Sequence, residues 1–155
     1  MSSKLELNVE ISADEVEVKL KGIIDEDSDF GKATNLNAKS YIFDFHEIES
    51  INSCGIREWI NYLTSISDDA HIVYRNCTQV IIEQMGMVKG FVREGASVES
   101  LFAPYFCEDC DDEFKHHLKV TEVQDKKAPQ VKCPSCGGEN TEFDAIEAQY
   151  FSFIK

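Results

Sequence analysis

The sequence predicts an α/β protein with a mixed, partly parallel β-sheet, followed by a small C-terminal module organised around four cysteines. Two observations predict it. Over the first hundred residues, strand-like alternation and short apolar runs are separated by stretches of helical periodicity. From Tyr105 onward, cysteines, acids and glycines replace that pattern. We therefore place one domain in residues 1–100 and the module in residues 101–155. A chain of 155 residues is long enough for one ordinary domain and a small additional module.

Two runs of alternating polar and apolar residues open the chain. Lys4–Ile11 and Glu15–Ile24 each place every second residue on one face, as half-buried strands do, and the short segment between them is a plausible turn. Together they predict a β-hairpin. The polar stretch Asp25–Asn37 is expected to form a loop or a short helix. Tyr41–Phe45 is a short apolar run, typical of a strand buried on both faces.

Two helices are predicted farther along the chain. An apolar stripe with three- and four-residue spacing runs from Ile56 to Ile66, and it includes Trp59, which we expect in the core. His71–Tyr74 predicts another short buried strand, and a second helix should follow, start at Asn76 or Thr78 and end near Gly86. Strands separated by helices of this length imply crossover connections and a partly parallel sheet.

Two segments each fit two kinds of secondary structure. Ser97–Phe102 fits a last strand or a helical turn of the first domain. Phe143–Ile154 has its apolar residues on one helical stripe, although its last residues would also suit a strand.

The four late cysteines form two C-x-x-C pairs, Cys107 with Cys110 and Cys133 with Cys136, separated by 22 residues. Two-residue spacing turns both sulfurs of a pair toward one point, so each pair supplies half of a tetrahedron of thiolates, the ligand set of structural zinc. Gly137 and Gly138 follow the second pair, where glycine permits positive φ and lets backbone N–H groups approach sulfur. One structural zinc ion is therefore expected, with no open coordination position for catalysis.

Other residues around the cysteines are given structural roles. Five acids surround the first pair and are expected to point away from the site into solvent: Glu108, Asp109, Asp111, Asp112 and Glu113. His116 and His117 are interpreted as a surface pair on a strand, since four sulfurs already complete the site. Cys54 and Cys77, in the first domain, are interpreted as small buried hydrophobic residues.

Composition restricts the function further. The chain has 29 acids against 15 bases, a net charge of −14, which disfavours nucleic-acid binding because that draws on clustered Lys and Arg. Five lysines of the module could still form a local basic patch: Lys115, Lys119, Lys126, Lys127 and Lys132.

No apolar stretch is long enough for a membrane span and the N-terminus lacks a signal-like segment, so a cytoplasmic protein is expected. No catalytic motif is found, and we expect no enzyme.

The segment Phe43–Ile56 (FDFHEIESINSCGI) resembles the central signature of STAS domains, a family that includes the antagonists of bacterial anti-sigma factors. In that family a buried strand is followed by a short loop and an Asp-Ser-small-Gly sequence that opens a helix. Lys21–Asp25 resembles the end of the family's second strand, and 71–80 and 83–87 resemble its later strand and helix. The resemblance covers roughly residues 4–95. It implies a mixed sheet with helices packed on one face.

The resemblance also implies a regulatory site at the start of the first predicted helix. The family's serine in this position is phosphorylated by a partner kinase that is also an anti-sigma factor, and Ser53 matches it. Asn52 stands where the family has Asp, and Cys54 stands where it has a small residue. With Gly55 and Asp25, these residues form the expected partner-binding face. The alternative for Ser53 is a plain helix N-cap worth about 1 kcal/mol.

Three hypotheses of function follow. The main one is a signalling protein that binds a partner such as an anti-sigma factor kinase, switched by phosphorylation of Ser53, with a zinc ribbon that widens the binding surface or fixes a homo-oligomer. The second is an accessory or scaffold subunit of a larger assembly, without a phosphorylation switch. The third is nucleic-acid binding by the zinc ribbon, which the net charge disfavours.

Overall fold

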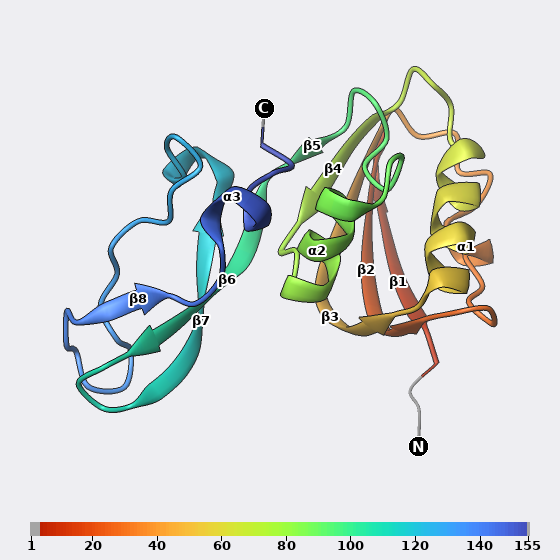
Figure 1. The fold of residues 1–155 in the computed structure, drawn as a ribbon. Helices are drawn as coiled ribbons and strands as arrows, with labels where there is room; N and C mark the ends of the chain where they lie inside the picture. The colour runs from red at the N-terminus through yellow and green to blue at the C-terminus, as the bar shows by residue number, and fades with distance from the viewer. Residues whose placement is uncertain (1–3, 155) are drawn as a thin grey trace.

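The computed structural model describes residues 4–154, which form a mixed α/β structure with two β-sheets and three α-helices (Figure 1). Residues 1–3, which begin the segment expected to lack a signal sequence, and residue 155 lie outside the described residues. Within the described range, no helix has the length and apolar character needed to cross a membrane.

The N-terminal hairpin is confirmed. β1 (Glu6–Ser12) and β2 (Glu15–Ile24) pair in antiparallel orientation, and the turn between them places Ala13 at a φ of 53°. Alternate residues of β2 are buried, beginning with Val16 and Val18, and the residues between them face outward. The bounds of β2 agree with the prediction because the alternation is continuous over all ten residues.

The rest of the first sheet is parallel. β3 (Ser40–Ile51) runs parallel to β2, β4 (His71–Arg75) parallel to β3, and β5 (Ser97–Val98) parallel to β4, in the order β1-β2-β3-β4-β5. The prediction that the β3 segment is buried on both faces was wrong. Tyr41, Phe43 and Phe45 are buried, whereas Asp44 is only half-buried and His46 is exposed, because helices cover one face only.

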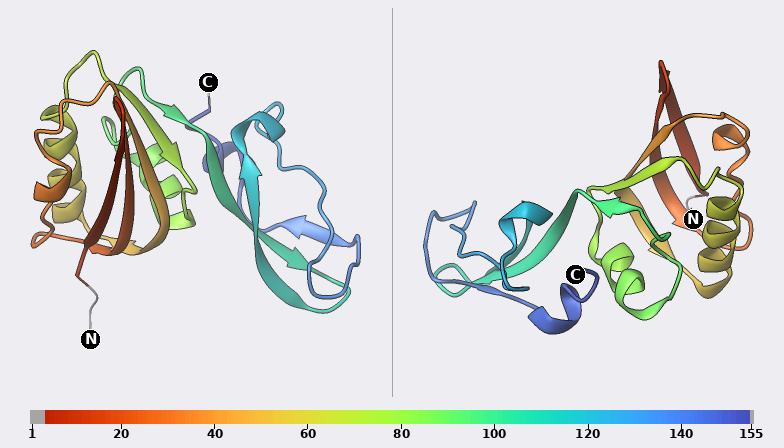
Figure 2. Two further views of the ribbon diagram at one scale, coloured as in Figure 1. Left: turned by 180° about the vertical axis from the view of Figure 1, so that it is seen from behind. Right: turned by 90° about the horizontal axis from the view of Figure 1, so that it is seen from above.

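Both long helices lie on the same face of this sheet (Figures 1 and 2). α1 (Ser53–Thr64) follows β3, α2 (Gln79–Met87) follows β4, and the β2–β3 connection holds a short 3-10 helix, Gly31–Ala33. Trp59, on the side of α1 that packs against the sheet, is fully buried, as expected. Its ring meets the rings of Phe43 and Tyr74 nearly edge-on, at centroid distances of 5.0 and 5.9 Å.

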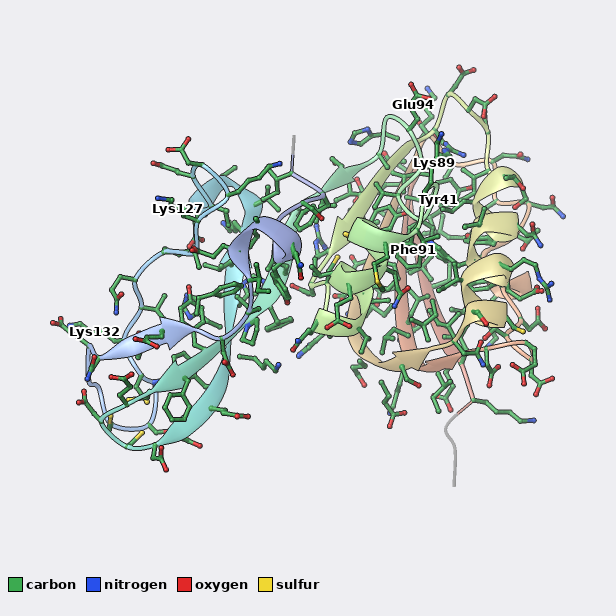
Figure 3. The ribbon with its side chains drawn as sticks, in the orientation of Figure 1. Tyr41, Lys89, Phe91, Glu94, Lys127 and Lys132 are labelled. Carbon is green, nitrogen blue, oxygen red and sulfur yellow. The ribbon has the colours of Figure 1, made fainter. Side chains whose placement is uncertain are left out.

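Two residues of the connection between α2 and β5, Phe91 and Arg93, anchor it to the rest of the first domain by hydrogen bonds. Phe91 is fully buried, and its carbonyl accepts hydrogen bonds from Trp59 Nε1 at 3.1 Å and from the Tyr74 hydroxyl at 2.6 Å (Figure 3). Arg93 donates through its guanidinium to the carbonyls of Leu63 and Ile66, at 3.0 and 2.8 Å, and to those of Ser67 and Ala70. A positive group there satisfies free carbonyls at the C-terminal end of α1.

The second sheet begins where the first one ends. β6 (Ser100–Cys107) follows β5 after one residue and pairs with β7 (Asp112–Lys119) and β8 (Thr141–Phe143), all antiparallel, in the order β7-β6-β8. A 3-10 helix, Val120–Glu122, follows β7, and α3 (Glu147–Tyr150) closes the chain. The segment expected to be helix or strand therefore contains the end of β8 and a four-residue helix.

The two parts pack directly against each other (Figure 2). Within the second part, the Tyr150 hydroxyl donates to the carbonyl of Phe102 at 2.6 Å, which fixes the C-terminal segment on β6, and Phe151 is fully buried. α2 approaches the C-terminal segment so closely that a Cβ atom on Gly86 would lie 2.6 Å from the Ser152 hydroxyl. Cys77, also fully buried, pairs in parallel with Leu101 of β6. The junction is thus a continuation of the core and not a loose linker.

Candidate functional site

The structure brings the four late cysteines together at the far end of the second sheet. Cys107 is the last residue of β6, Cys110 lies in the turn before β7, and Cys133 and Cys136 lie in the loop before β8. Their four sulfur atoms lie within 4.8 Å of one another. Cys107 and Cys133 are buried, while Cys110 and Cys136 are exposed.

The sulfur spacing suits a metal ion better than disulfides. The Sγ atoms of Cys107 and Cys136 are 3.6 Å apart, as are those of Cys110 and Cys133. A disulfide needs about 2.05 Å between sulfurs. Four thiolates each about 2.3 Å from a tetrahedral ion would lie about 3.8 Å from one another, close to the observed distances. The expectation of a shared four-cysteine metal site is therefore supported by this geometry.

The backbone around the second pair is shaped to approach sulfur. Gly137 has a φ of 73°, and its N–H donates to the carbonyl of Cys133 at 2.8 Å. The next N–H, of Gly138, points to Cys136 Sγ at 3.4 Å. The pKa of the Cys133 thiol is lowered to about 7, chiefly by a hydrogen bond from the backbone N–H of Cys136, whereas burial and the neighbouring sulfurs raise the pKa of the Cys110 thiol. Such N–H groups favour the thiolate, which is the form that binds metal.

The acids around the first pair are all exposed, as expected, but two of them contact the second pair. Asp112 accepts a hydrogen bond from the Ser135 hydroxyl at 3.3 Å. The Asp109 carboxylate lies against Gly138, where an added Cβ atom would be 2.3 Å from its oxygen. The expectation that all five point away from the site was therefore wrong. The backbone N–H of Glu108 also donates to the carbonyl of Asn140, which joins the two turns.

The expected partner-binding face lies at the N-terminal end of α1. Asn52 is the N-cap, and its side-chain oxygen accepts from the N–H of Gly55 at 2.7 Å. Ser53 is the first helical residue and is exposed. It is therefore not the N-cap, and the alternative role predicted for it belongs to Asn52. Asp25 and Cys54 are half-buried beside it. Gly55 is buried, so it shapes this face without presenting a side chain to a partner.

A glutamate next to this face was missed by the sequence analysis. Glu26 accepts a hydrogen bond from the side-chain amide of Asn52 at 3.0 Å. Its own backbone N–H and the amide of Asn52 lower the pKa of this carboxyl below its usual value. The side-chain amide of Asn52, the residue preceding Ser53, is therefore used on both its oxygen, which accepts from Gly55, and its nitrogen, which donates to Glu26. The amide pairing joins residues 26 positions apart, and sequence periodicity carries no signal for it.

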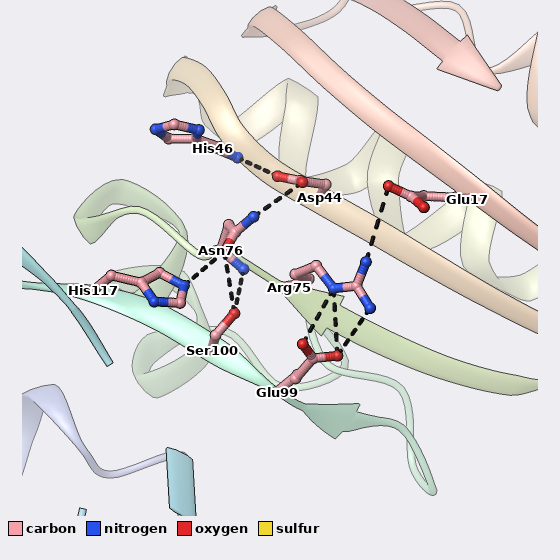
Figure 4. Close-up of polar contacts among 8 residues, drawn as sticks. All are labelled: Glu17, Asp44, His46, Arg75, Asn76, Glu99, Ser100 and His117. Atoms are coloured by element: carbon pink, nitrogen blue, oxygen red, sulfur yellow. Dashed lines mark hydrogen bonds and ion pairs between the residues drawn. The ribbon is translucent and has the colours of Figure 1, made fainter. Parts of the chain in front are cut away.

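A polar network at the junction of the two sheets was also missed (Figure 4). Asn76 adopts a left-handed backbone with a φ of 54°, and its amide donates to Asp44 at 3.0 Å. Its side-chain oxygen accepts from the Ser100 hydroxyl at 3.2 Å and lies 2.8 Å from His117 Nε2. Because that oxygen can only accept, His117 carries its proton on Nε2 here. His117 is thus on a strand, as expected, but it binds the first domain.

An ion pair strengthens the same junction. Arg75, at the end of β4, donates to Glu99 at 3.2 Å through both Nε and a terminal nitrogen, and its other nitrogen lies 3.9 Å from Glu17 (Figure 4). The hydrogen bonds to Glu99 raise the pKa of the Arg75 guanidinium. Bidentate geometry of this kind fixes orientation as well as adding energy. Arg75 therefore ties the residue between β5 and β6 to β4 and β2.

Comparisons with models of protein families, with curated proteins and with solved structures found no match to this chain. The expected mixed sheet is present, but membership of the STAS family stays a prediction. Within the residues that the structure describes, the four cysteines are the group found with metal-binding geometry.

Proposed function

We propose that the chain is a non-enzymatic regulatory protein that binds a partner protein through the N-terminal end of α1, and that its second sheet is a zinc ribbon. The observation that carries the first part is the exposed Ser53 hydroxyl on the first turn of a twelve-residue helix. The first N–H groups of a helix have no partner inside it and favour a bound anion. A kinase could therefore reach this hydroxyl, and the helix would tolerate the phosphate.

Phosphorylation would change the charge of this face strongly. A phosphate adds about −1.5 to −2 charges. The Glu26 carboxylate is already hydrogen-bonded to the side chain of Asn52, the residue that precedes Ser53. A partner that contacts the unmodified face would meet this added charge without compensation, so the complex would dissociate. An anti-sigma factor with serine kinase activity is the kind of partner that the STAS resemblance implies.

The test uses purified protein, ATP and extract from the host cell. We expect phosphate on Ser53 by mass spectrometry, and we expect Ser53→Asp to lose a partner that Ser53→Ala retains. Thr64→Asp, at the opposite end of α1, serves as the charge control and should retain it. Phosphate absent from Ser53, or a partner held equally by all three variants, would reject the switch.

Zinc is the ion we propose for the four cysteines. Four thiolates with no oxygen or nitrogen ligand form a soft site that suits zinc, and a closed tetrahedral site is structural. Cys107, Cys110, Cys133 and Cys136 would hold the ion, which would join the two turns. Elemental analysis of protein purified without added metal should return one zinc per chain. Iron or no metal would reject the assignment.

The accessory-subunit hypothesis is favoured by one observation. Asn52 presents an amide already bound to Glu26, in place of the free carboxylate that the STAS family has there. On this hypothesis the chain joins a stable assembly without any modification. Native mass spectrometry without ATP separates the two, since a stoichiometric complex unaffected by Ser53→Asp supports the subunit.

Nucleic-acid binding has little support from the arrangement of the lysines. Lys115 lies against α2, where its Nζ donates to Gln79 at 2.7 Å. Lys127 and Lys132 lie on the side of the second sheet that faces away from the first domain (Figure 3). Lys132 is also 3.8 Å from Glu139. These charges do not form one stripe, and we do not propose this function.

A further inference from the structure

Two of the largest exposed apolar side chains face the same groove. Among the described residues, the exposed large hydrophobic side chains are Ile11 (64% exposed), Met87 (73%) and Ile146 (62%). Met87 ends α2, and Ile146 immediately precedes α3. Both line a groove of about 510 Å³ between these helices. Clefts of about 300 to 1,000 Å³ are the usual size for binding sites, so the groove is large enough for side chains of a partner.

The groove is formed jointly by the two parts of the protein. Gln79, Glu83 and Gly86 of α2 form one wall, and Ala145, Ala148 and Tyr150 are among the residues of the other. Gly86 lies close to Ser152, which follows α3, and both residues line the groove. Six of the lining residues are small or apolar, and four are polar: Gln79, Glu83, Gln149 and Ser152. Exposed apolar patches with a polar rim are typical of protein interaction sites.

The rim is acidic. Glu83 lies on it, and the groove continues past Gln79 into a second hollow of about 320 Å³ that contains Glu113 and Asp144. The basic side chain in that hollow is Lys115, which is held by Gln79. Three acids therefore face one base. The whole chain carries −14, so a second copy would be repelled and a basic partner attracted.

We propose that this groove binds a basic amphipathic segment of another protein, which inserts two apolar side chains between Met87 and Ile146 and places lysine or arginine beside the acidic rim. The surface is separate from the N-terminal end of α1, so the proposal does not depend on Ser53. Helix-in-groove recognition of this type uses apolar anchors one helical turn apart.

The test measures binding of a synthetic probe to the full-length protein by fluorescence anisotropy. The probe is a labelled 14-residue helical peptide with two leucines at i and i+4 and lysines on the opposite face. A matched peptide has alanine in place of both leucines. We expect the leucine peptide to bind and Met87→Gln or Ile146→Gln to raise its Kd about fivefold or more. Ile11→Gln, which also removes an exposed isoleucine without changing charge, should leave Kd within about twofold.

The acidic rim is tested separately from the apolar floor. Glu83→Lys should weaken the leucine peptide more than Asp68→Lys, an equal charge change on an exposed loop after α1. Ser53→Ala should leave the Kd unchanged. Equal Kd values for the wild-type protein, Met87→Gln and Ile146→Gln would overturn the proposal, as would equal binding of the alanine peptide. A dimer seen by sedimentation without peptide and lost in Met87→Gln would assign the groove to a second copy, and would also overturn it.

Discussion

Gly55 of α1 lies directly against the backbone carbonyl of Ile24 at the end of β2. A Cβ atom at position 55 would be 2.1 Å from that carbonyl oxygen and 2.5 Å from its carbon. Glycine therefore lets the first turn of α1 touch the sheet, and this contact positions Asn52 and Ser53 beside the β2 end. The glycine in the segment that resembles a STAS signature thus has a steric reason of its own.

We predict that Gly55→Ala destabilises the protein by about 3 kcal/mol, because neither the helix nor the strand backbone can yield without breaking its hydrogen bonds. Urea denaturation followed by Trp59 fluorescence measures the change. Gly86→Ala is the matched control, since its closest contact is the rotatable Ser152 hydroxyl and alanine favours a helix by about 1 kcal/mol. Equal midpoints for the two variants would contradict the steric explanation.

Arg93 gives the second prediction. Its guanidinium donates to carbonyl groups at the end of α1, including those of Leu63 and Ile66. Arg93→Met should keep much of the side-chain volume and lower the free energy of unfolding by about 2 kcal/mol. Arg57→Met, an exposed arginine on the same helix, should change it by less than about 0.5 kcal/mol. A similar loss in both variants would argue for a general charge effect.

If the four cysteines hold the proposed ion, the second sheet should need it and the first sheet should not. The only tryptophan, Trp59, is buried in the first domain, so its emission reports on that domain alone. Chelation should make residues 105–145 sensitive to protease while the Trp59 emission maximum stays unchanged. Cys136→Ser should have the same effect without chelator, and Cys54→Ser, outside the four-cysteine cluster, should retain one metal per chain. Protease resistance after complete metal removal would show that the sheet folds without metal.

The sequence predicted those features that short stretches of chain encode. The bounds of β2 follow from continuous alternation, and the four-cysteine cluster follows from two local pairs whose sulfurs converge. The extension of β3 to Ile51 was missed because His46, Glu47 and Glu49 read as a loop. Glu47 in fact pairs with Lys21 of β2, and His46 and Glu49 fall at the two register shifts of this pairing. The helical connections predicted a partly parallel sheet, but the register of each pair is not encoded locally, since it also depends on the partner strand.

The junction network shows a second limit of sequence analysis. Asn76 and His117 are 41 residues apart, and neither position differs in type from an ordinary turn asparagine or surface histidine. Their contact depends on the angle between two sheets, which follows from packing of α2 against the C-terminal segment. The sequence analysis named Asn76 only as a candidate start of α2, which Thr78 caps instead. Its left-handed backbone, which asparagine tolerates better than most residues, is seen only in the structure.

The last prediction concerns that asparagine. Asn76→Asp keeps the shape and the left-handed backbone but replaces the amide that donates to Asp44 by a second carboxylate. Two carboxylates at hydrogen-bond distance raise the pKa of at least one of them in the folded state. A raised folded pKa lowers stability above that pKa, and the loss shrinks as pH falls toward the ordinary carboxyl value of about 4.

We therefore expect Asn76→Asp to cost about 2 kcal/mol at pH 7.5 and clearly less at pH 5, measured by urea denaturation at both values. The groups that face the new carboxylate are Asp44, Ser100 and His117. Asn61→Asp, exposed on α1, is the control and should show no such difference. A loss of stability that is equal at the two pH values would mean that lost hydrogen bonds, and not the paired carboxylates, weaken the junction. In that case the polar network would stabilise the junction through its hydrogen bonds and not through the charge state of its carboxylates.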